Sequence, residues 1–184
     1  MKNIFRLLVM LIPMLSVSAQ EMKVAGPDGK LQVTVSNHWG GVYYSVDYNG
    51  KTMLEHSPLG MQTNIGDFTK GLSVTSHVTR PIEKTYHQDR IKASEIHYQA
   101  NELIFTVENA VKQKMYITFR VSNNDIAFRY TLERIGETGS VVVKDEATAF
   151  SFPEQTTTFL TPQSDAMIGW KRTKPSYEEE YVAD

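Results

Sequence analysis

The chain has 184 residues, 41% of them hydrophobic, with 19 basic and 21 acidic side chains and a formal net charge of −2. It contains no cysteine, which excludes disulfides, thiolate metal sites and a cysteine nucleophile, so core burial must hold the fold together. The slightly acidic balance disfavours a nucleic-acid partner, because such proteins need a basic patch to displace counterions from phosphates.

The first 19 residues have the composition of a secretory signal peptide. Lys2 and Arg6 precede an apolar run over Leu7–Leu15, and small residues follow it. This run is too short to cross a bilayer, which takes roughly 20 residues as a helix, so the pattern favours cleavage before Gln20 over a membrane anchor. The mature chain, residues 20–184, is then the size of one domain and is expected to be periplasmic or secreted, without a membrane contact of its own.

Beyond the leader, apolar and polar residues alternate, and no stretch of a dozen residues shows the 3.6-residue apolar spacing of a helix. The chain therefore reads as β-strands, starting with Leu31, Val33 and Val35 on one face after a turn over residues 26–29. Asn49-Gly50 is the strongest hairpin signal, because both residues tolerate the positive φ of a type I′ turn. Strands are predicted over residues 31–35, 42–48, 51–54, 72–79, 96–100, 103–108, 115–121, 126–132, 141–145 and 157–160.

The order of these strands points to one architecture. Turn-forming residues at 123–125 and 136–139 separate the strands, and no βαβ unit is visible. With this many strands in one domain, we predict an all-β fold of two packed antiparallel sheets rather than one closed barrel.

Motifs for common catalytic machinery are absent from the sequence. There is no GxSxG, GxGxxG or P-loop pattern, and the five histidines lack the HExxH spacing of a zinc site. Two tryptophans stand apart from the strand pattern. Trp39 precedes Gly40-Gly41, and Trp170 lies close to an acidic cluster. An exposed ring at either position can stack on the apolar face of a sugar, although packing against the sheet is the alternative.

The acidic cluster is Tyr177-Glu178-Glu179-Glu180-Tyr181. Its carboxylates are the oxygen donors that calcium prefers, but calcium takes ~6–8 oxygens and these residues cannot supply them all. A solvated loop is the other interpretation of such a run of charges.

Several segments in a fixed order resemble the opening of the family 97 glycoside hydrolases. The last of them, Tyr177-Glu178-x-x-Tyr181, looks like the YExxY motif of that family. The resemblance covers essentially the whole mature chain. The earlier segments are Gly26–Val35, Tyr43–Lys51, Ser57–Gly60, Phe119–Val121 and Ile126–Tyr130.

The resemblance implies an N-terminal super-sandwich, similar to the galactose-mutarotase-like fold, that packs on a catalytic (β/α)₈ barrel and helps wall the sugar site. Members are exo-acting α-glucosidases or α-galactosidases, so α-linked glucosides or galactosides are the expected substrates. The inverting members depend on calcium, and the N-terminal domain lends one glutamate to that ion. Glu178 is the matching position here, and Trp170 and Tyr177 are expected to contact substrate.

Glycoside hydrolysis needs a pair of carboxylates, which the family places in the barrel. No catalytic residue is therefore assigned here, and the chain is expected to be the inactive front part of a longer enzyme, truncated at its C-terminal end. A free-standing exported carbohydrate-binding module is the alternative, and a sandwich without a ligand is a third. From Met167 onward the sequence shows no strand pattern or closing element, and it breaks off at residues 182–184 just after the proposed motif, which favours the first hypothesis.

Overall fold

The computed structural model describes residues 20–90, 94–134, 137, 139–160 and 182–183. Within these ranges the chain forms strands, turns and irregular segments, and no helix occurs there. The described residues accordingly contain no helix of the length and apolarity needed to span a membrane.

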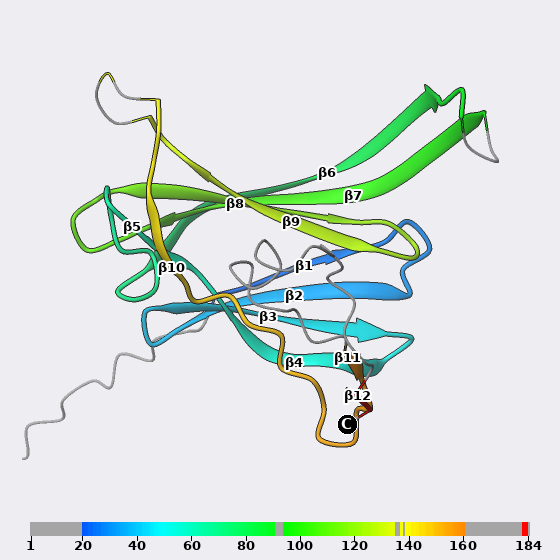
Figure 1. Cartoon of the computed structure of the whole chain (residues 1–184), viewed down its shortest axis with the longest axis horizontal. Helices are drawn as coiled ribbons and strands as arrows, with labels where there is room; N and C mark the ends of the chain where they lie inside the picture. The colour runs from blue at the N-terminus through cyan, green and yellow to red at the C-terminus, as the bar shows by residue number, and fades with distance from the viewer. Residues whose placement is uncertain (1–19, 91–93, 135–136, 138, 161–181, 184) are drawn as a thin grey trace, which may run out of the picture.

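Two four-stranded antiparallel sheets form the body of the domain and lie one above the other (Figure 1). In each sheet the strands follow one another in chain order, because short turns connect neighbouring antiparallel strands. The first sheet consists of β1 (Gln20–Ala25), β2 (Leu31–His38), β3 (Gly41–Tyr48) and β4 (Lys51–Leu59). The second consists of β6 (Ser73–His87), β7 (Glu95–Glu108), β8 (Lys114–Val121) and β9 (Ile126–Leu132).

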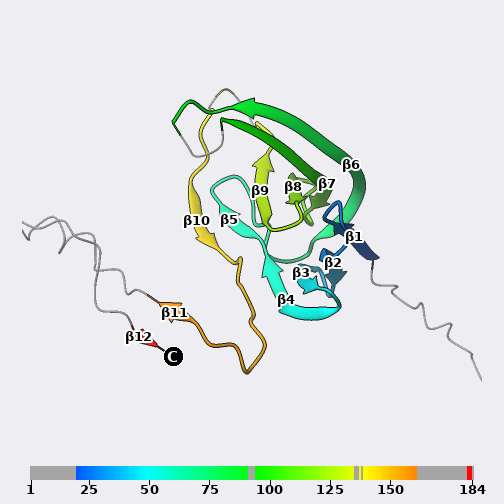
Figure 2. The same cartoon turned by 90° about the vertical axis from the view of Figure 1, so that its right-hand side faces the viewer.

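Two short strand pairs accompany the sheets. β5 (Met61–Thr63) pairs with β10 (Val143–Glu146), and β11 (Phe159–Leu160) pairs with β12 (Val182–Ala183). Seen from the end of the sandwich, β10 and the segment after it run down one side of the two sheets (Figure 2).

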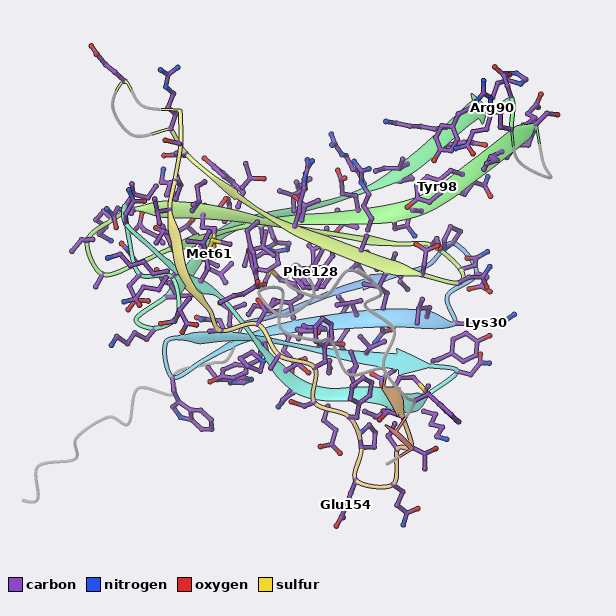
Figure 3. All side chains as sticks on the ribbon, viewed as in Figure 1. Lys30, Met61, Arg90, Tyr98, Phe128 and Glu154 are labelled. Carbon is purple, nitrogen blue, oxygen red and sulfur yellow. The ribbon has the colours of Figure 1, made fainter. Side chains whose placement is uncertain are left out.

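The core lies between the two sheets and is rich in aromatic rings. Phe119 on β8 is fully buried, and its ring centroid lies 5.7 Å from that of Tyr44 on β3 and 5.4 Å from that of Phe128 on β9. Figure 3 shows Phe128 between the layers. Both sheets bury alternate side chains against this cluster, which confirms the predicted all-β fold of two antiparallel sheets. The other core residues include Val33, Val35, Val42, Leu59, Leu103, Phe105, Val107, Met115 and Ile117.

One prediction about the strands was wrong. Residues 96–100 and 103–108 were expected to form two strands, because Asn101 and Glu102 interrupt the apolar pattern, yet β7 is continuous through them. Both polar side chains find partners far away in sequence. Asn101 Nδ2 donates to the Ala25 carbonyl over 2.7 Å, and Glu102 binds two arginines of the neighbouring strands. The strand continues because the tertiary structure satisfies these groups.

The first strand, β1, was not predicted, although Met22 and Val24 alternate with polar residues. The apolar pair is short and gives only a weak strand signal. The tight turn after it was predicted correctly, and Gly29 adopts φ +74° there.

The two hairpins of the first sheet close with the same backbone conformation. Asn49-Gly50 joins β3 to β4 with φ values of 51° and 76°, as predicted, and Trp39-Gly40 joins β2 to β3 with φ values of 49° and 75°. Two consecutive positive φ values are the mark of a type I′ turn, in which Asn is favoured at the first position. Trp39 has no such preference, and the left-handed conformation costs a residue with a Cβ about 1–2 kcal/mol.

β6 and β7 extend beyond the rest of their sheet as a two-stranded arm (Figure 1). β8 pairs with β7 only over Asn101–Glu108, so the half of β7 before Asn101 pairs with β6 alone. Tyr98 and Arg90 lie on this arm (Figure 3). The rings of Tyr86 and Tyr98 stack there with centroids 6.4 Å apart.

Candidate functional site

The predicted site residues Trp170, Tyr177 and Glu178 lie outside the described residues, as do Glu179 and Glu180. The described segment that leads to them in sequence is Ala147–Leu160, which follows β10. We call it the edge segment, because it runs along β4, the last strand of the first sheet.

Backbone hydrogen bonds hold the edge segment against β4. The residues around Ser57 exchange these bonds with it, and Ser57 Oγ accepts another from the Ser151 amide over 2.9 Å. The edge segment thus satisfies backbone groups that a free sheet edge would expose. The backbone bonds run from Ala147 N to Gly60 O (2.9 Å), from Ala149 N to Pro58 O (3.2 Å) and from Glu55 N to Ser151 O (2.8 Å).

Two tyrosines from the sandwich fix the same segment from inside. The Tyr44 hydroxyl donates to the Ala149 carbonyl over 3.2 Å, and the Tyr130 hydroxyl pairs with Thr148 Oγ1 over 2.5 Å while accepting from the Gly60 amide. Burial raises the pKa of both phenols above the ordinary value of 10.0. Both therefore remain protonated at neutral pH and act as anchors rather than as acids or bases.

The outer side of the edge segment is apolar and exposed. Phe150, Phe152 and Phe159 are each more than half exposed, although aromatic residues of this size are usually well covered. A groove of about 750 Å³ separates the segment from the start of β4. Glu154 points outward from this region (Figure 3). The groove is lined by Val46, Lys51, Thr52, Met53, Leu54, Ile126 and residues 152–157. A partly apolar surface of this kind suits contact with another protein surface.

A second hollow, of about 520 Å³, lies between the loops around residues 62–71 and 109–113. Its amide side chains bind the loops themselves. Asn109 donates to the Asp67 carbonyl and to Gln113 Oε1, and Gln113 Nε2 donates to the Ile65 carbonyl. The polar side chains of this hollow therefore serve to hold the two loops together.

Glu102 is the most deeply buried carboxylate among the described residues, with 1% of its surface exposed. Arg80 binds Oε1 at 2.7 Å and Arg120 binds Oε2 at 2.6 Å, each from a neighbouring strand. Burial is the largest single influence and would raise the pKa of Glu102, but the hydrogen bonds and charges of Arg120 and Arg80 together hold the pKa below its ordinary value. Glu102 is therefore charged at neutral pH and is part of a structural ion pair rather than a general acid.

Four of the five histidines, which the sequence scatters, lie in two groups. The ring centroids of His38 and His56 lie 6.1 Å apart, and His87 and His97 both contact the carboxylate of Glu95. Only the antiparallel pairing of distant strands could reveal these neighbours. Among the described residues, no group of three or more His, Asp or Glu side chains is placed to hold a metal ion.

Comparison with known proteins agrees with this fold. The solved structure of a β-arabinopyranosidase is 63% identical to the chain, with a TM-score of 0.83, and the match covers 90% of this chain and 26% of that one. A family 97 enzyme of Pseudoalteromonas sp. strain K8, in complex with panose, is 19% identical with a TM-score of 0.70, and the match covers 78% of this chain and 22% of that one. A probable retaining α-galactosidase of Streptomyces bingchenggensis is 29% identical over 136 residues, which are 74% of this chain and 20% of the relative.

The chain therefore spans between a fifth and about a quarter of the length of these relatives. The family model described as glycosyl-hydrolase 97 N-terminal matches residues 24–184. The two-sheet sandwich, its likeness to solved family 97 structures and this match lead to one conclusion: the chain belongs to the N-terminal domain family of the glycoside hydrolase family 97 enzymes.

Proposed function

We propose that this chain is the sugar-site-completing N-terminal domain of an exported, exo-acting family 97 glycosidase. The observation that supports this role most directly is the edge segment. Its backbone is anchored to β4 and its residues bind the hydroxyls of Tyr44 and Tyr130, while Phe150, Phe152 and Phe159 remain exposed. The ring of Phe150 meets that of Tyr44 edge-on at 6.4 Å, but its exposed part, together with Phe152 and Phe159, suits the surface of a catalytic domain. The leader at residues 1–19 supports export and cleavage before Gln20.

The activities of two relatives indicate which class of sugar the proposed substrate contains. One relative is a β-arabinopyranosidase and another is a probable retaining α-galactosidase. In the L series, a β-arabinopyranoside has the ring configuration of an α-D-galactopyranoside that lacks C6. We therefore propose a substrate of galacto configuration, in preference to an α-glucoside.

The test uses an enzyme that carries this domain and three nitrophenyl glycosides: the β-L-arabinopyranoside, the α-D-galactopyranoside and the α-D-glucopyranoside. The kcat/KM for the arabinopyranoside or the galactopyranoside should exceed that for the glucopyranoside by about tenfold or more. Contacts between the pocket and the sugar hydroxyls discriminate strongly between such substrates. The 184-residue chain alone should hydrolyse none of the three, because the pair of carboxylates lies elsewhere. Faster turnover of the glucoside would reject the substrate, and turnover by the chain alone would reject the role as a non-catalytic domain.

Calcium is the proposed cofactor of the complete enzyme, with Glu178 as a ligand. The donor set fits a hard cation, because three adjacent carboxylates offer oxygen atoms. It is incomplete for calcium, which takes ~6–8 oxygens, so other parts of the enzyme would supply the remaining ligands. The ion would supply positive charge at the sugar site, and Glu178 would help hold it there.

In the full enzyme, Glu178→Gln should lower the calcium-dependent activity by about tenfold, because it removes one negative charge from the ligand set. Glu179→Gln, the matched control, should have a much smaller effect, since it lies beside the motif position. Titration of activity and of calcium binding in both variants measures this. If Glu179→Gln is the damaging change, the residue assignment is wrong. If neither change matters, the acidic run is a solvated loop.

A further inference from the structure

Trp39 is the most exposed large hydrophobic residue in the described part of the chain, with 99% of its surface accessible. It occupies the first position of the β2–β3 turn at φ +49°, where the equivalent turn between β3 and β4 has Asn49 at φ +51°. Asn suits this left-handed position and Trp does not. The indole gains no burial in return. Neither the turn nor the core explains this residue, and such outliers gather at functional positions.

The indole is part of an aromatic cluster on the outer face of the first sheet. Its ring centroid lies 6.0 Å from that of His38, which lies 6.1 Å from that of His56. A β-bulge in β4 brings His56 to this position, because two residues of β4 lie opposite the single residue Ser45 of β3. Bulges of this kind re-aim side chains and are frequent beside functional sites.

Tyr43 lies two residues after Gly41 on β3, and its phenol passes close to that glycine. A Cβ on Gly41 would lie 2.8 Å from Cε2 and 2.9 Å from the hydroxyl oxygen of Tyr43, so a larger residue there would force the phenol to move. The phenol thereby reaches back along β3 to the residue that follows the Trp39-Gly40 turn. Ser36 pairs with Tyr43 across the strands, is 2% exposed, and its hydroxyl has no partner among the described residues.

These side chains combine a flat apolar ring with neutral polar groups. Two imidazoles and a phenol can donate and accept hydrogen bonds, while the indole offers a π-face to C–H groups. A pyranose ring has the complementary chemistry, with an apolar face of C–H groups and a rim of hydroxyls. An apolar protein surface would leave the imidazoles and the phenol without partners.

We propose that Trp39, His38, His56 and Tyr43 form a binding platform for a pyranose sugar. The platform stands apart from the proposed function, since it depends neither on calcium nor on a catalytic barrel. The indole stacks on the ring of the sugar, and the histidines and Tyr43 bind its hydroxyls.

The experiment uses the 184-residue chain or its mature form, with methyl α-D-galactopyranoside and maltose as probes. The chain has two tryptophans, and the indole N–H signal of Trp39 in an NMR spectrum is identified by its loss in Trp39→Asn. At least one probe should shift this signal in a saturable way, with a dissociation constant on the order of millimolar. Trp39→Asn should abolish the saturable binding and leave the Tm equal or higher, because Asn suits the turn.

A double variant, Trp39→Asn with Asn49→Trp, provides the matched control. It moves the indole to the equivalent turn, at nearly the same φ but away from Gly41 and His38. It should not bind either probe. The proposal is overturned if the native chain shows no saturable shift, if Trp39→Asn binds as well as the native chain, or if the double variant binds equally well. It is also overturned if sedimentation shows a dimer that Trp39→Asn dissociates while neither sugar binds.

Discussion

Glu102→Gln should lower the free energy of unfolding by about 2–4 kcal/mol at pH 7, because it leaves two arginines facing a neutral amide inside the sheet. Arg80 and Arg120 donate to opposite oxygens of this carboxylate. The amide nitrogen of Gln would face one of these donors and could not accept from it. The expected loss is below the upper end for buried pairs, since both arginines keep part of their contact with water.

The stability difference should also depend on pH. The pKa of Glu102 is lower in the folded protein than its ordinary value of 4.5, so its charged form contributes stability that is fully present above that value. This contribution is lost as the pH falls through the folded pKa. Urea unfolding of both proteins at pH 7 and near pH 3 measures the effect, and the difference between them should shrink at the lower pH.

Glu83→Gln is the control for Glu102→Gln, because it removes the same charge from the same sheet at an exposed position. It should change the free energy of unfolding by about 0.5 kcal/mol or less. Equal effects of the two changes would mean that Glu102 acts only through net charge, and the ion pair would then have no structural role.

Gly60→Ala should lower the free energy of unfolding by about 3 kcal/mol or more, since strain and a backbone clash act together. Gly60 has φ +149°, a region that side chains rarely adopt, and an added Cβ would lie 2.4 Å from the Phe68 carbonyl oxygen. The amide of Gly60 donates to the Tyr130 hydroxyl, and its carbonyl accepts from Ala147. Movement at this position should therefore release the edge segment.

Gly29→Ala separates strain from the clash. Gly29 also has positive φ, at +74°, but an added Cβ meets nothing within 4 Å. Gly29→Ala should therefore lower the free energy of unfolding by only about 1–2 kcal/mol. Urea unfolding gives the free energies, and limited proteolysis reports the exposure of the edge segment. If Gly60→Ala costs no more than Gly29→Ala and the segment stays protected, the anchoring role of Gly60 is wrong.

Local patterns were enough to predict much of the fold. The alternation at Leu31, Val33 and Val35 and the turn at Asn49-Gly50 depend on residues a few positions apart, so they are readable in one dimension. The ordered segments that resemble family 97 glycoside hydrolases likewise identified the family, which the match over residues 24–184 confirms. The site residues Trp170, Tyr177 and Glu178 stay predictions, because they lie outside the described residues.

By itself, the sequence determined the fold class, the Asn49-Gly50 hairpin and the family, because period-two alternation and turn chemistry are local properties. Only the tertiary structure decided which polar groups have partners and which rings remain exposed. Glu102 is accommodated in β7 because Arg80 and Arg120 lie 22 and 18 residues away in sequence but on adjacent strands. His38 on β2 and His56 on β4 lie on either side of β3, and the sheet brings their rings to 6.1 Å. Pairing between strands creates these neighbours, and no short window of sequence contains them.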